Sequence, residues 1–117
     1  MTILLLLLVT GALQSTKAEL AGIVRDPSGL PVPEAEVRIA NAGTDAELKI
    51  GTGADGSYRF FALPPGDYEI RVTKQGFSAL KRTGISLRVG DHLDLDLTLA
   101  VGNIDEFVEV TAAAPLL

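Results

Sequence analysis

The run of residues 52–77 constrains the fold most, because turns of defined chemistry join its two alternating apolar segments. The alternating residues are Tyr58, Phe60, Tyr68, Ile70 and Val72. A period of two places such side chains on one face of a β-strand. Asp55-Gly56 precedes the first segment and Pro64-Pro65-Gly66 precedes the second. The run therefore predicts β-structure, with the Asp-Gly pair forming a two-residue hairpin.

The same period recurs along the chain, with Gly, Pro, Asp or Asn between the runs. The further runs are residues 20–25, 35–41, 47–54, 85–89 and 93–99. In the last of them we expect four side chains to point into the core: Leu93, Leu95, Leu97 and Leu99. No periodic segment reaches helix length. The pattern predicts an all-β fold, a seven-stranded antiparallel β-sandwich.

Composition limits the chemistry that this chain can perform. It has no Cys, which excludes disulfides and thiolate metal ligands. Its net charge of −5 argues against nucleic acid as a partner. With 117 residues there is room for a single core of its own.

An apolar N-terminal stretch predicts export. Residues 3–13 are mostly apolar, and Thr16-Lys17-Ala18 is a small-x-small cleavage site. We expect a signal peptide over residues 1–18, cut between Ala18 and Glu19, and a mature net charge of −6 after loss of Lys17. A membrane anchor is the alternative, but a spanning helix needs about 20 apolar residues. A lipoprotein signal would need a Cys.

The sandwich pattern of residues 20–78 resembles the carboxypeptidase regulatory-like domain. Its first motif is Gly22-x-Val24-x-Asp26-x-x-Gly29-x-Pro31-x-x-x-Ala35-x-Val37. Its second is Thr52-x-x-Asp55-Gly56-x-Tyr58-x-Phe60-x-x-Leu63-x-x-Gly66-x-Tyr68-x-Ile70-x-Val72, followed by Gly76-Phe77. The resemblance implies a seven-stranded sandwich of transthyretin-like or starch-binding-like type over residues 19–101. It says little about function.

The later residues resemble the N-terminal extension of bacterial TonB-dependent receptors. The similarity lies in Gly84-Ile85-x-Leu87-x-Val89-Gly90, in the alternating leucines and in residues 106–115. One segment is similar to the TonB box: Asp105, Glu106, Phe107, Val108, Glu109, Val110, Thr111 and Ala112. The resemblance implies the periplasm or cell outer membrane, and a TonB-type periplasmic protein or the receptor's own plug and barrel as partner.

Two interpretations of residues 102–117 stay open. As a TonB-box-like segment, the chain would add as a strand to the partner's sheet, with Val108 and Val110 in alternate pockets. As a structural element, residues 107–111 would be the last strand of the sandwich. The apolar end Pro115-Leu116-Leu117 leads us to expect a truncated linker in a longer protein.

Other polar residues make weak sites. His92 is the only histidine, so a His-based zinc site or a Ser-His-Asp triad in its familiar form is excluded. Three aspartates near it, at positions 91, 94 and 96, favour a solvated sheet face over a calcium site. We expect outward-facing acids at Glu34, Glu36 and Glu69. No metal and no cofactor are predicted.

The leading hypothesis is therefore a non-catalytic accessory domain of a TonB-dependent receptor. A secreted carbohydrate-binding or adhesion module is the alternative, and a regulatory domain associated with a peptidase is the third. Sugar sites stack rings on exposed aromatics, but this chain has no Trp. The aromatics left for such a site are Phe61, Phe77 and Phe107, because the other three fall on the inward phase.

Overall fold

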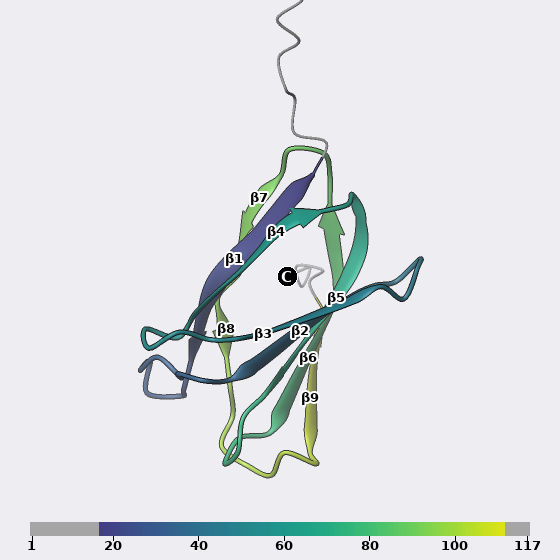
Figure 1. The fold of residues 1–117 in the computed structure, drawn as a ribbon. Helices are drawn as coiled ribbons and strands as arrows, with labels where there is room; N and C mark the ends of the chain where they lie inside the picture. Colours follow the sequence, from purple (N-terminus) through teal and green to yellow (C-terminus); the bar gives the residue numbers. More distant parts are fainter. Residues whose placement is uncertain (1–16, 112–117) are drawn as a thin grey trace, which may run out of the picture.

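The computed structural model describes residues 17–111 as two β-sheets packed face to face (Figure 1). The smaller sheet holds β1 (Ala18–Arg25), β4 (Ser57–Leu63), β7 (His92–Asp94) and β8 (Leu97–Thr98). The larger sheet, in the order β3-β2-β5-β6-β9, holds β2 (Glu36–Asn41), β3 (Glu47–Gly51), β5 (Gly66–Thr73), β6 (Ala79–Leu87) and β9 (Phe107–Thr111). No helix in the described chain is long and apolar enough to cross a membrane. The predicted all-β sandwich is confirmed.

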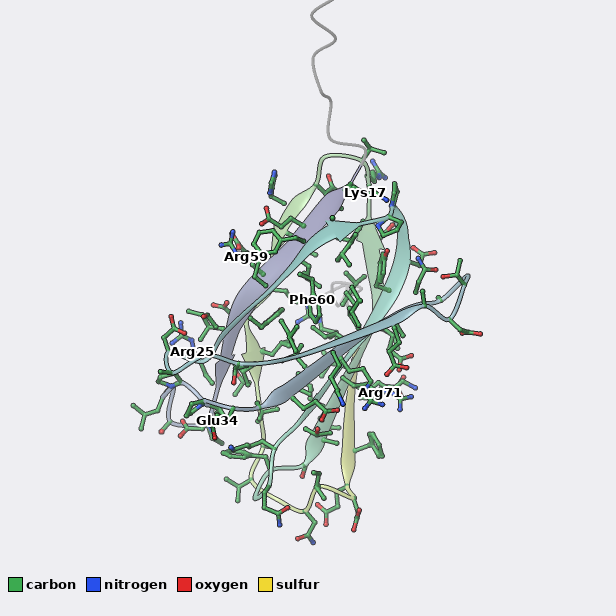
Figure 2. All side chains as sticks on the ribbon, in the orientation of Figure 1. Lys17, Arg25, Glu34, Arg59, Phe60 and Arg71 are labelled. Carbon is green, nitrogen blue, oxygen red and sulfur yellow. The ribbon has the colours of Figure 1, made fainter. Side chains whose placement is uncertain are left out.

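Alternation along the strands builds the core between the sheets. Ile70 and Val72 on β5 lie opposite Ile39 and Val37 on β2, and all four are buried. The smaller sheet contributes the predicted inward aromatics of β4, and Figure 2 shows Phe60 pointing between the sheets. Arg59 and Arg71 point away from the core. Burial of these side chains supplies the main driving force for folding.

Strand number and direction differ from the expected seven antiparallel strands. Residues 17–111 form nine strands, because the run 93–99 is split into β7 and β8 and residues 107–111 add β9. Three pairings are parallel: β7 with β1, β8 with β1, and β9 with β6. Parallel neighbours need long connections, and period-two patterns cannot show strand direction.

The expected hairpin at Asp55-Gly56 is wrong. Strand β3 pairs with β2 in the larger sheet, whereas β4 pairs with β1 in the smaller one, so this turn carries the chain between sheets. The buried Thr52 holds the crossing point. Its hydroxyl donates to the Val32 carbonyl at 2.7 Å and accepts from the Ala35 amide at 2.8 Å. The sequence thus located the turn correctly, but the turn connects two sheets instead of two paired strands.

The four alternating leucines are buried unequally. Leu97 and Leu99 are 2% and 1% exposed, while Leu95 is partly buried and Leu93 is 36% exposed, which corrects the prediction that all four point into the core. Leu93 lies opposite the buried Leu20, so its phase is the expected one. Because β7 is an edge strand, its flank remains open to solvent.

Gly22 explains why the leucine run breaks between β7 and β8. A Cβ at this position would lie 1.8 Å from the Leu95 carbonyl oxygen. The Tyr58 hydroxyl donates to the same oxygen, and the Asp96 carboxylate accepts from the Ile23 amide at 3.0 Å. A side-chain acceptor thus replaces a backbone acceptor in the ladder.

A β-bulge interrupts the alternation along β6, so the sequence pattern did not predict the first half of this strand. The predicted strand at residues 85–89 begins instead at Ala79 and ends at Leu87, which leaves Val89 exposed. Between the pairs Tyr68–Ile85 and Ile70–Arg82 the register shifts, and Gly84 has a φ of 74°. Such a bulge inverts the phase of alternation, so Leu80 and Ile85 are both buried.

We predict that Leu97→Asp unfolds the domain and that Leu93→Asp does not. A carboxylate at the buried position 97 costs several kcal/mol, comparable to a total stability of about 5 to 15 kcal/mol. The same change at the partly exposed position 93 leaves the carboxylate in contact with water. Thermal melting followed by circular dichroism measures both. A cooperative Leu97→Asp melt at the wild-type temperature would contradict the placement of β8.

We also predict that Thr52→Val lowers the free energy of unfolding by about 1 to 3 kcal/mol, although the side-chain shape is kept. The change leaves the Ala35 amide and the Val32 carbonyl without their partner at a buried position. Thr98→Val on β8, where the side chain is exposed, is the control and should change little. Urea denaturation checks both, and equal midpoints would show that the hydroxyl bonds are not needed.

Candidate functional site

The segment at residues 105–111 forms a free edge of the larger sheet. Asp105 and Glu106 lie in a turn, and Phe107–Thr111 is β9, parallel to β6. The Ala79 amide donates to the Glu106 carbonyl at 2.7 Å, which fixes the start of the pairing. Figure 1 shows β9, in yellow, alongside β6. Ala112, the last residue of the predicted partner segment, lies outside the described residues.

Exposed apolar side chains distinguish β9 from the inner strands. Phe107 is 62% exposed, Val108 40% and Val110 39%, while the acidic Glu109 between the valines is also exposed. Within the described chain only β6 pairs with β9, so the backbone groups on its outer side have no strand beside them. Edges of this kind are templates for another strand. The structure thus bears out the structural interpretation of residues 107–111, and binding to a partner stays a prediction.

The predicted cleavage site falls within β1. Ala18 is the first residue of this strand and is buried opposite Leu63, while residues 1–16 lie outside the described residues. The Glu19 carboxylate contacts two neighbours on the outer face of the smaller sheet. His92 Nδ1 lies 2.5 Å from one carboxylate oxygen, and an Arg59 nitrogen lies 3.1 Å from the other. Signal cleavage here stays a prediction.

The predicted polar candidates have structural partners. His92 is exposed on β7 and contacts Glu19. Asp96 accepts from the Ile23 amide, and Asp91 accepts from the Arg88 amide at 2.8 Å. Across residues 17–111 no group of three or more His, Cys, Asp or Glu side chains is arranged to hold a metal ion. The acids Glu36 and Glu69 pair with arginines on the outer sheet face.

Asp26 and Asp55, in two of the turns, also have structural partners. The pKa of Asp26 is lowered, chiefly by a hydrogen bond from the Ser28 hydroxyl, and that of Asp55 is lowered chiefly by the Ser57 hydroxyl. Both serines lie two residues after their aspartate, and their amides donate to the same oxygen. These carboxylates therefore shape turns, the usual role of Asp at such positions.

The three aromatics considered for sugar stacking lie apart. Phe61 is exposed on β4 of the smaller sheet, with the Arg59 guanidinium 5.6 Å from its ring centre. Phe107 is on β9 of the larger sheet, and Phe77 packs partly against the core. In the described part of the chain the only ring pair is Tyr58 with Phe60, inside the core. The exposed rings do not join into one platform.

An apolar groove at one end of the sandwich escaped the sequence analysis. It has a volume of about 760 Å³ and lies between the β2–β3 loop and the corner before β5. Its walls include the core residues Ile39, Leu63 and Tyr68, together with the exposed Leu48. The Tyr68 hydroxyl donates to the Pro64 carbonyl at 2.5 Å, which supports the corner. The Pro-Pro-Gly corner was the available signal, but only packing shows that it borders a groove.

Comparison with known proteins supplies the wider context. The model of the family described as the carboxypeptidase regulatory-like domain matches residues 19–100. The TonB-dependent transporter Oar of Myxococcus xanthus is 28% identical over 110 residues, which cover 94% of this chain. The chain spans about a tenth of that relative's length, since the match covers 10% of it.

Solved structures show the same fold at low sequence identity. A putative carbohydrate binding protein from Bacteroides uniformis is 16% identical with a TM-score of 0.59, covering 71% of this chain and 41% of that one. The 5-hydroxyisourate hydrolase of Klebsiella pneumoniae is 24% identical with a TM-score of 0.55, covering 74% and 93% respectively. Enzymes and putative binding proteins share this sandwich, so the likeness shows the fold alone.

We predict that Tyr58 makes the sandwich sensitive to alkali. Burial foremost, and then the negative charge of Asp96, raises the pKa of its phenol. In the unfolded chain this tyrosine ionises near its ordinary pKa of 10.0, whereas the folded protein keeps it neutral. The free energy of unfolding is therefore unaffected by this group below that pH, and falls as the pH rises above it. Tyr58→Phe should cost about 1 kcal/mol at neutral pH but lose less stability between about pH 9 and about pH 11. Urea titrations at both pH values test this, and equal losses would refute it.

Proposed function

Because the chain belongs to the carboxypeptidase regulatory-like domain family, we propose that it is a non-catalytic accessory domain of a TonB-dependent outer-membrane receptor. The match to a TonB-dependent transporter over 94% of the chain is the observation that carries this proposal. The proposed location is the periplasm or cell outer membrane. In that setting a small sandwich serves to space, dock or signal, while import is done by the rest of the receptor.

A non-catalytic role agrees with the use of the polar side chains. The Tyr58 hydroxyl holds the Leu95 carbonyl, and the Thr52 hydroxyl joins two segments. The carboxylates of Asp26 and Asp55 accept from turn amides and hydroxyls. Catalysis requires polar groups that remain available to a substrate. These groups instead maintain the fold.

The partner in this proposal is a TonB-type periplasmic protein, bound through residues 105–112. Strand addition is backbone chemistry, and it needs an extended segment whose outer amides and carbonyls are free. Strand β9 meets that requirement, and its exposed valines at 108 and 110 are spaced for alternate pockets. Two acids, at positions 106 and 109, would favour a basic partner edge.

The carbohydrate-binding alternative has weaker support. It depends on the fold shared with a putative carbohydrate binding protein and on the single ring of Phe61 beside Arg59. The ring of Phe61 has no second exposed ring beside it within residues 17–111. Affinity-gel retardation tests it, because migration unchanged by every polysaccharide would count against sugar binding. The sequence downstream of residue 117 separates the receptor from a peptidase-associated protein.

We predict that Val108→Asp/Val110→Asp abolishes capture of the chain by an immobilised periplasmic TonB domain. The change places carboxylates where apolar pockets are expected, which removes the contacts that give strand addition its specificity. Leu48→Asp makes the same kind of change at β3, the opposite edge, and should leave capture intact. Deletion of residues 105–112 should also abolish capture. Equal recovery of all four proteins would end the proposal.

A further inference from the structure

A row of charged residues crosses the outer face of the larger sheet from one edge to the other. The cross-strand partners, in order from β3 to β9, are Lys49, Arg38, Arg71, Lys81 and Glu109. Four cations thus lie side by side, an arrangement that is destabilising unless other charges offset it. The two ends of the row have opposite sign.

Acids beside the row neutralise its interior but not its ends. Arg38 pairs with Glu36 at 2.9 Å and with Glu47 at 2.8 Å. Glu69 lies 2.7 Å from Arg71 and 3.9 Å from Lys81. Over residues 17–111 neither Lys49 nor Glu109 has an ion pair, and both are exposed. The unsatisfied charges are therefore the two at the sheet edges.

Apolar residues flank each of these end charges. On β3, Lys49 lies between Leu48, which is exposed, and Ile50, which is partly buried against the core. On β9, Glu109 lies between the exposed Val108 and Val110. Alternation places both apolar pairs on the opposite face from the charges. Each edge thus carries the same apolar-charged-apolar pattern, with the charge reversed.

The strand directions allow the two edges to meet. Successive antiparallel pairings run from β3 through β2 and β5 to β6, and β9 is parallel to β6. Strand β9 therefore runs opposite to β3 within one sheet. If a second copy is placed beside the first in the same orientation, β9 of one copy lies antiparallel to β3 of the next.

We propose that copies of this chain associate head to tail, with β9 of one molecule pairing with β3 of the next to continue the larger sheet. In this register Glu109 faces Lys49, Val108 faces Ile50 and Val110 faces Leu48. Phe107 then lies opposite Gly51, where its ring has space. The contact uses two different edges, so it is heterologous and propagates rather than closing a dimer.

Repulsion between like charges disfavours pairing of β9 with β9 or of β3 with β3 in two copies. A two-fold pairing centred on β9 would place Glu109 against Glu109, and one centred on β3 would place Lys49 against Lys49, each a like-charge pair. Only the mixed contact unites opposite charges. The usual role of a lysine on an edge strand is to repel other strands, and the experiment below distinguishes that role from attraction to Glu109.

Charge reversal in the full chain tests the proposal. Sedimentation velocity over a concentration series measures association of wild type, Lys49→Glu, Glu109→Lys and the double variant Lys49→Glu/Glu109→Lys. Each single change makes the facing charges alike and should weaken association about tenfold. The double variant restores opposite charges and should associate as wild type does. Arg88→Glu, an exposed change away from both edges, is the control.

The outcomes separate clearly. Loss of association in both single variants with recovery in the double variant supports the contact, because the two single changes shift the net charge in opposite directions and a net-charge effect could not weaken both. The same sedimentation in all four overturns it. Stronger association in Lys49→Glu would instead show that the lysine acts as an edge guard. TonB capture does not enter these measurements, so the receptor proposal is tested separately.

Cross-linking tests the register. The chain has no Cys, so a mixture of Leu48→Cys and Val110→Cys proteins can form only the disulfide under test between unlike copies. We expect oxidation to enrich the mixed dimer at least about threefold over Val110→Cys mixed with Phe61→Cys, where position 61 is exposed on the other sheet. Equal yields from the two mixtures would rule out this register.

Discussion

Pairing along β1 is the constraint on which the smaller sheet depends. This strand lies antiparallel to β4 on one side and parallel to β7 and β8 on the other, so it joins every other strand of that sheet. Its buried residues Leu20 and Val24 face the inner side of the larger sheet. Gly22 lets the Leu95 carbonyl approach, and the Tyr58 hydroxyl secures it. These contacts hold the first strand of the domain against the segment around Leu95, which lies far along the chain.

The edges and the open end of the sandwich are the surfaces on which the proposed function depends, because several buried and turn polar groups serve the fold. In the turns at Asp26 and Asp55 the carboxylates accept from a serine hydroxyl and from backbone amides, and the Thr52 hydroxyl bonds to backbone groups. Among the open features of residues 17–111 are the unpaired backbone of β3 and β9, the apolar side chains on those strands, and the groove near Leu48. Such surfaces suit the proposed recognition of other chains through shape and strand pairing. The proposed accessory role needs only these surfaces.

The two edges of the larger sheet are the surfaces through which the proposed accessory role would be carried out. Strand β9 carries the segment that resembles a TonB box, and its outer side offers backbone groups to one added strand at a time. A second copy and a TonB-type protein would therefore compete for the same edge. Self-association would then regulate how many of these segments are accessible, through mass action alone.

The local sequence pattern determined most strands and turns of this protein. Alternation at residues 58–60 and 68–72, and the Gly, Pro and Asp residues between the strands, depend only on neighbouring residues. For residues 107–111 the pattern left a last strand and a partner segment as two open interpretations, and only the structure shows that this strand is a sheet edge. The pattern missed the first half of β6, because the bulge at Gly84 inverts the phase. Tertiary structure alone decided that β3 and β4 lie in different sheets, that β7, β8 and β9 run parallel to their neighbours, and that Lys49 and Glu109 end one row. Those features depend on which distant strands meet, and the energy of such a meeting is absent from any short stretch of sequence.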